Sequence, residues 1–261
     1  MHRLLHPIFF MHVPKCAGKS VFSILSRKFD RAQICPQPPY GTWQWKASEV
    51  RGYSLYSGHF STDFVEEMAT GGSKLVIMRH PLSRVVSLYD FWRSYRWDYI
   101  RSSLPPPPFN GPALAKSGSL MSFLETTSEF GVSRIYNTVA RQVLGRRFAQ
   151  LWPNEDAIIS ESISALRGFA WVGISELFSP SAALLCAMLQ LPVASPEPLE
   201  GVTHDVSTDP HREMVSKSKA TAVEAERILE GNRVDLALYE EGRKILQERI
   251  GQTLADPSTS G

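Results

Sequence analysis

The chain has 261 residues, of which 43% are hydrophobic and 21% charged, so it can bury one core of ordinary globular size. Its net charge of +2 is too small for a nucleic-acid coat, although a local basic pocket for a small anion fits it. Three scattered cysteines without a Cys-x-x-Cys pair argue against a disulfide framework and against a structural zinc site.

The first predicted elements are a strand, a loop and a helix. The apolar run PIFFMHV, bounded by Pro7 and Pro14, has the pattern of a buried strand. After the stretch HVPKCAGKS, the apolar residues Val21, Ile24 and Leu25 recur at helical spacing. This layout points the main-chain N–H groups of the helix start at the loop, where they can hold an anion.

Two further apolar runs predict strands. YSLYSGHF ends near His59, and KLVIM stops at Arg79, after which Pro81 suits the first turn of another helix. Between these runs, STDFVEEMA predicts a helix capped by Ser61 or Thr62.

The remainder of the chain is read as mostly helical. Residues 97–119 are rich in proline and are expected to form an irregular, mobile loop. Helical patterns follow over 120–127, 134–144, 160–166 and 219–250. FAWVGISE predicts another buried strand before the apolar helix SAALLCAMLQL, and residues 251–261 are expected to be a disordered tail.

Short apolar strands that alternate with helices predict an α/β fold. We expect a single domain over residues 1–250, a three-layer sandwich of the P-loop type with a central parallel sheet flanked by helices and a Pro-rich loop excursion. Ligands of such sheets bind beyond the carboxyl ends of the strands. The stretch at 14–20, His59 and Arg79 all fall at such ends.

The triplet Gly18-Lys19-Ser20 matches the end of a Walker A phosphate loop. That loop needs a glycine where Val13 stands, and an acidic residue at a neighbouring strand end helps to hold Mg²⁺. The run KLVIM ends on Arg79 instead. An Mg²⁺-dependent P-loop kinase is therefore the less favoured alternative, and no metal is expected.

Basic residues at both strand ends suggest an anion site. Lys15 and Lys19 with the helix amides would hold a dense anion without a metal, unless they are solvated lysines around a structural turn. Arg79 could grip a second phosphate with two hydrogen bonds, and Ser87, two helical turns on, could add its hydroxyl. Equally, Arg79 could be a surface cation and Ser87 a hydroxyl on a helix face.

Together, these motifs and their order resemble the PAPS-dependent sulfotransferase family. FFMHVPKCAGKS is similar to the family's 5′-phosphosulfate loop, and VIMRHPLSRVVSLYDF is similar to its 3′-phosphate motif. YSGHFSTDF, RIYNTVARQVLG and WVGISELF resemble segments of the heparan/uronyl 2-O-sulfotransferase-like group and its bacterial relatives. The resemblance spans residues 8 to 190.

The resemblance implies in-line transfer of a sulfuryl group from 3′-phosphoadenosine-5′-phosphosulfate (PAPS) to a hydroxyl of a carbohydrate or related acceptor. The product of the donor would be 3′,5′-phosphoadenosine (PAP). His59 would be the catalytic base, since imidazole titrates near working pH, and Lys15 would stabilise the leaving oxygen. The donor would be bound by Lys15, Cys16, Ala17, Gly18, Lys19, Ser20, Arg79 and Ser87.

The segment RIYNTVARQVLG supplies two candidate acceptor residues. Asn137 and Arg141 could line the acceptor groove, although helix capping or ion pairing is equally expected of them. Cys16 stands where the family usually has a hydroxyl residue, and Lys19 replaces a common threonine. These departures motivate a second hypothesis, a nucleotide-binding module without catalysis. With neither a membrane span nor a signal peptide in sight, we expect a soluble, cytoplasmic protein with no nucleic-acid partner.

Overall fold

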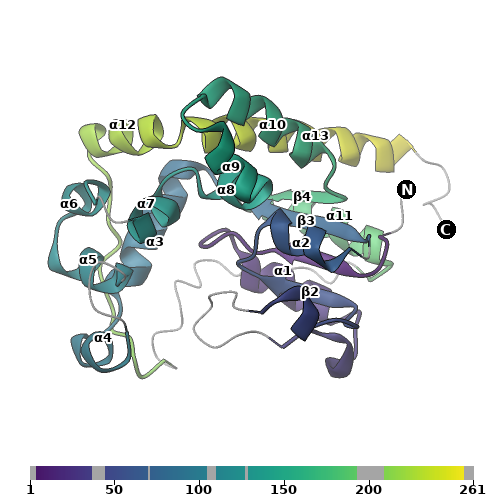
Figure 1. Ribbon diagram of the computed structural model, residues 1–261, viewed down its shortest axis with the longest axis horizontal. Helices are drawn as coiled ribbons and strands as arrows, with labels where there is room; N and C mark the ends of the chain where they lie inside the picture. The colour runs from purple at the N-terminus through teal and green to yellow at the C-terminus, as the bar shows by residue number, and fades with distance from the viewer. Residues whose placement is uncertain are drawn as a thin grey trace. The chain divides into compact units, whose positions relative to one another are not determined.

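The computed structural model describes residues 4–36, 45–69, 71–104, 110–126, 129–192 and 209–255 (Figure 1). The chain forms two compact units. The first comprises Met1–Arg79, Val139–Pro198 and Ala237–Gly261, and the second comprises His80–Thr138 and Leu199–Leu236. The expectation of one domain over 1–250 stays a prediction.

A parallel sheet of four strands lies at the centre of the first unit, in the order β2-β1-β3-β4. The strands are β1 (Ile8–Met11), β2 (Leu55–Gly58), β3 (Ser73–Met78) and β4 (Trp171–Ile174). Met11, at the end of β1, pairs with Gly58 of β2 and Val76 of β3. All four residues of β1 are buried, as the near-continuous apolar run predicts for a sheet covered on both faces.

Helices cover both faces of this sheet. On one face, the indole N–H of Trp171 donates to the carbonyl of Ser181 in α11 at 3.1 Å, and α11 packs beside α1. On the other face, Phe64 of α2 packs on the ring of Phe9, and Gly242 of α13 lies against Met78. The predicted α/β class with a central parallel sheet and flanking helices is confirmed.

The helices of the first unit are α1 (Gly18–Ser26), α2 (Thr62–Met68), α8 (Thr138–Leu144), α9 (Arg146–Leu151), α10 (Glu155–Arg167) and α11 (Phe178–Leu189), with the larger part of α13 (Arg233–Ala255). Three short 3₁₀ turns, η1 (Arg31–Gln33), η3 (Ala47–Glu49) and η4 (Ser175–Leu177), complete its described elements. Ser61 occupies the N-cap position of α2, one of the two positions expected from the sequence, although its side chain makes no capping hydrogen bond.

The second unit is helical. Its helices are α3 (Pro81–Arg93), α4 (Trp97–Ser103), α5 (Gly111–Ser117), α6 (Leu120–Leu124), α7 (Glu129–Ile135) and α12 (Ala222–Gly231). Leu88, Trp92, Phe123 and Ile228 belong to one apolar core that joins α3, α6 and α12. Pro81 begins α3, as predicted.

Three sequence predictions of local structure were wrong. Residues 97–119 contain α4 and α5, because Asn110 caps α5 by accepting from the N–H of Ala113 and Pro112 fits its first turn. Residues 105–109 lie outside the described residues. The helix expected over 134–144 is interrupted by Asn137, whose φ is 50°. The tail expected from 251 is helical as far as Ala255, and 256–261 lie outside the described residues.

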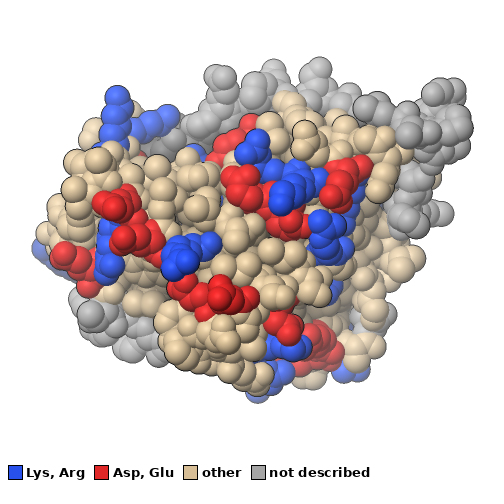
Figure 2. Space-filling view, turned by 90° about the horizontal axis from the view of Figure 1, so that it is seen from above, with Lys and Arg blue, Asp and Glu red and all other residues tan. Residues whose placement is uncertain are grey.

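Charged side chains are mixed on the face drawn in Figure 2, where neither sign gathers into a large area. Ion pairs between exposed side chains include Arg167 with Glu248 and Arg243 with Glu240. None of the described helices is both long and apolar enough to cross a membrane.

Candidate active site at the carboxyl ends of the strands

The loop between β1 and α1 turns sharply into the helix. Lys15 and Ala17 adopt left-handed backbone conformations, with φ of 67° and 61°, which cost free energy in residues that carry a Cβ. The carbonyl of Ala17 accepts from the N–H groups of Ser20 and Val21 at 3.1 and 3.2 Å. The helix therefore begins immediately after the strained turn, above the end of the central strand.

Three main-chain amides lie at this turn and at the start of α1. Within the described part of the chain, the N–H groups of Ala17, Gly18 and Lys19 donate to no protein acceptor. They begin a helix of nine residues with no acidic residue in its first turn. Unpaired N–H groups at the positive end of a helix dipole favour an anion. Three of the residues predicted to bind the donor, Ala17, Gly18 and Lys19, thus have main-chain N–H groups with no acceptor among the described residues.

Cys16 and Ser20 have different surroundings from those amides. The Cys16 N–H donates to Val13 O at 3.3 Å, and its buried thiol faces the carbonyl of Pro14 at 3.7 Å. The Ser20 N–H is used within the first turn of α1, and its side chain is half-buried. Cys16 thus packs the loop from inside, and its predicted donor contact stays a prediction.

Arg79 lies beside the same loop. It follows β3, the neighbour of β1, and its Nη1 donates to the main-chain carbonyl of Lys15 at 3.3 Å. This contact holds the peptide that follows the strained Lys15 conformation. The structure therefore brings Arg79 and Lys15 together, as expected for two residues at adjacent strand ends.

His59 follows β2 on the other side of β1. Its Nδ1 lies 2.5 Å from the main-chain carbonyl of His12, and the N–H of His12 donates to the carbonyl of Gly58 at 2.8 Å. Since a carbonyl only accepts, Nδ1 carries the proton and the lone pair of the neutral imidazole is on Nε2. This tautomer is the one that a general base needs.

His12 is a site residue that the sequence analysis missed. Its ring lies 4.6 Å from that of His59 between centroids, and a Cβ added to Gly18 would lie 1.9 Å from its Cδ2. Burial lowers the pKa of His12 from 6.5 to about 3, helped by the positive charge that His59 carries when it is protonated and by the charges of Lys15 and Lys19. His12 is thus neutral at physiological pH. The one sequence signal for it was its place directly before the anion loop.

The segment that carries His59 is held by α8. The amide Nε2 of Gln142 donates to the carbonyl of Phe60 at 3.0 Å, and the hydroxyl of Thr62 donates to the carbonyl of Val143 at 2.9 Å. Both contacts are buried. They fix the chain directly after the candidate base.

The predicted acceptor residues have packing partners. Asn137 is buried, and its Oδ1 accepts from the N–H of Asp235 at 3.3 Å, in the first turn of α13. The guanidinium of Arg141 lies 4.2 Å from the ring centroid of Phe148. These contacts are a hydrogen bond at a helix start for Asn137 and a ring contact for Arg141, and the expected roles at the acceptor, in capping or in ion pairing stay predictions. Ser87 lies half-buried on α3 of the second unit.

Residues 5–125 match the model of the sulfotransferase family, somewhat less than half of the chain. This match agrees with the resemblance found in the motifs of these residues. The finer likeness to the uronyl 2-O group stays a prediction. Within the described residues, no three His, Cys, Asp or Glu side chains are grouped so that they could hold a metal ion.

No curated protein matches the sequence. Among solved structures, the chain is similar to a mouse sulfotransferase complexed with PAP, at 14% identity and a TM-score of 0.39, over 97% of this chain and 85% of the other. At that TM-score the likeness supports no conclusion about this chain.

Proposed function

We propose that this protein transfers a sulfuryl group from PAPS to a hydroxyl of a carbohydrate or related acceptor. One observation carries the proposal: three main-chain amides with no acceptor among the described residues, Lys15 and a histidine of the required tautomer all lie at the carboxyl ends of β1 and β2. The family match over residues 5–125 supports it independently.

The first unit supplies the groups that such a donor needs. The amides of Ala17, Gly18 and Lys19 would hold the 5′-phosphate, and Lys15 would lie beside the bridging oxygen. Arg79, fixed next to the loop, would bind the 3′-phosphate that distinguishes PAPS from an ordinary nucleotide. A role of Ser87 at the same phosphate stays a prediction from the resemblance.

The chemistry then follows from two side chains. His59 Nε2 would take the acceptor proton as the acceptor oxygen bonds to sulfur, and the bond from sulfur to the bridging oxygen breaks. Lys15 would stabilise the charge that develops on that oxygen, and removing one such group typically raises a barrier by roughly 3–4 kcal/mol. The main-chain carbonyl of His12, which accepts a hydrogen bond from Nδ1 of His59, would keep the base oriented.

Titration of the purified protein with PAP, and then turnover with PAPS and a panel of glycans, tests the proposal. We expect PAP to bind without added metal and PAP release to depend on a hydroxyl acceptor. Lys15→Ala should abolish release, whereas Lys28→Ala, on the exposed turn after α1, should not change it.

Two results would overturn the proposal. Tight binding of PAPS without turnover on any acceptor would favour the non-catalytic nucleotide-binding module. ATP turnover that EDTA abolishes would favour the Mg²⁺-dependent kinase.

A further inference from the structure

We propose that His12 is a positioning residue that couples the donor loop to the catalytic base, by standing as a neutral ring between Gly18 and His59. The inference rests on the proposed function. It concerns how the loop that binds the donor and the base that removes the proton are kept in the correct relative position.

The main chain of His12 makes the first connection. Its N–H donates to Gly58 O at 2.8 Å, and its carbonyl accepts from Nδ1 of His59. The residue is thus bonded to β2 immediately before the base and to the base itself. Any shift of the chain at His12 displaces the ring of His59 with it.

The side chain of His12 makes the second connection. A Cβ on Gly18 would lie 1.9 Å from His12 Cδ2 and 2.0 Å from its Nε2, so the imidazole lies directly against the first residue of α1. The same ring lies 4.6 Å from His59 and is nearly parallel to Phe10, at 5.9 Å between centroids. Three elements of the site therefore pack on one ring.

The charges around this ring favour a neutral spacer. Lys15, Lys19 and His59 are the titratable groups that act on it, and all are positive or become positive. A cation at His12 would repel the proton that His59 must accept and would weaken the base. Burial keeps the pKa of His12 near 3, so His59 works beside an uncharged ring.

The ring also explains why Gly18 has no side chain. Its backbone does not require glycine, because no left-handed φ is recorded for it. What excludes a Cβ is the imidazole of His12. Gly18→Ala should therefore push the ring toward His59 or lift the start of α1, and either change misaligns the site.

A double-mutant cycle tests the coupling. We expect His12→Ala and Gly18→Ala each to lower kcat by about 10-fold to 100-fold, since small misplacements of reacting groups cost that much. Gly18→Ala should cost little in the His12→Ala background, where the space is open. His12→Phe, which keeps a neutral ring, should retain most of the activity. Gly251→Ala is the matched control, a helical glycine whose Cβ would meet nothing within 4 Å.

A second readout needs no turnover. In imidazole NMR spectra, PAP should shift the ring signals of His59 in the wild type and in His12→Phe, and by less than half as much in His12→Ala. Three results would overturn this inference without affecting the proposed function. They are a PAP-induced shift in His12→Ala as large as in the wild type, an equal loss of kcat in His12→Phe and His12→Ala, and additive effects of His12→Ala and Gly18→Ala. Failure of the wild type to bind PAP would instead overturn the proposed function on which it rests.

Discussion

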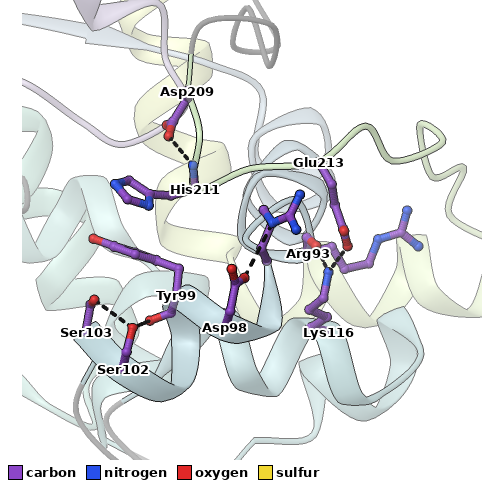
Figure 3. Close-up of polar contacts among 10 residues, drawn as sticks. Arg93, Asp98, Tyr99, Ser102, Ser103, Lys116, Asp209, His211 and Glu213 are labelled. Atoms are coloured by element: carbon purple, nitrogen blue, oxygen red, sulfur yellow. Dashed lines mark hydrogen bonds and ion pairs between the residues drawn. The ribbon is translucent and has the colours of Figure 1, made fainter.

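The donor loop at 12–20 in the first unit and the segment at 209–219 in the second are both irregular, yet different forces hold them. The donor loop is held by main-chain hydrogen bonds, a neutral imidazole and the guanidinium of Arg79. We call residues 209–219 the strap. Charged and aromatic side chains hold the strap along α3, α4 and α5 (Figure 3).

Two side chains of α3 form hydrogen bonds with the strap. The buried carboxylate of Asp90 accepts from the N–H and the hydroxyl of Ser218 at 3.0 and 2.7 Å. One turn later, Nη2 of Arg93 donates to Ser216 O at 2.8 Å. Lys116 donates to Arg93 O and pairs with the carboxylate of Glu213. We call these contacts of Asp90, Arg93 and Lys116 with the strap the clamp.

Stacked rings fix the start of the strap. The guanidinium of Arg212 lies 3.9 Å from the ring of Phe91 and 4.3 Å from that of Tyr95. His211 stacks on Tyr99 at 4.3 Å between centroids. Such contacts keep charged groups paired where they leave water, whereas the donor loop keeps amides available for a ligand. The strap is thus organised for its own stability, and the donor loop for an anion.

The largest expected effect separates a histidine of the donor-loop region from one of the strap. His59→Ala should lower kcat by about 10²–10⁴-fold, because a positioned general base contributes that much, while PAP affinity stays within a few fold. Steady-state kinetics and PAP titration measure the two quantities. His211→Ala is the control and should leave kcat unchanged. Loss of PAP binding in His59→Ala would give His59 a structural role.

Asp90→Ala should destabilise the protein by about 3 kcal/mol, since two hydrogen bonds to a buried charge are lost and each is worth about 1.5–3 kcal/mol. Urea unfolding measures the change. Asp98→Ala removes an exposed partner of Arg96 and should not move the unfolding midpoint. Equal midpoints for the two variants would show that the clamp does not stabilise the strap.

Arg79→Ala should weaken PAP binding by about 10–100-fold, the range of one or two charge-assisted hydrogen bonds. The affinity for adenosine 5′-phosphosulfate, which lacks the 3′-phosphate, should fall much less. Calorimetric titration of both ligands makes the comparison. Equal losses would mean that Arg79 acts through its hydrogen bond to Lys15 O and leave it no role at the 3′-phosphate.

The same contrast explains what the sequence could predict. The residues of the donor loop lie within nine positions of one another, so their spacing shows the turn, the helix start and the lysines. The sequence also predicted that His59 and Arg79 lie near this loop, because the carboxyl ends of parallel strands meet at one edge of a sheet. The hydrogen bonds from Asp90 and Arg93 to the strap join residues more than a hundred positions apart, such as Asp90 and Ser218, and no local pattern predicts such a pair.

The predictions of local structure were wrong where one residue type is common in two kinds of local structure. Asn110 and Pro112 are typical of irregular loops, yet here they start a helix, because a cap and a proline are also what a first turn accepts. Asn137 interrupts the predicted helix at 134–144 by a left-handed φ, which asparagine tolerates better than most residues but which the helical spacing of its neighbours does not predict. His12 was missed because its role depends on Gly18, whose proximity only the folded loop creates.

The smallest expected effect concerns acid and the ring of His12. Its pKa is about 3 in the folded protein and near 6.5 when unfolded, so the unfolded chain binds an extra proton between these values. Stability is therefore complete above pH 6.5 and falls as the pH decreases, by about 1 kcal/mol at roughly pH 5.5. His12→Phe has no such group, so its urea unfolding should lose about 1 kcal/mol less over that range than the wild type does. Equal losses of unfolding free energy in both proteins would show that water reaches the ring of His12, so that it can be protonated in the folded state. A protonated His12 would then lower the basicity of His59.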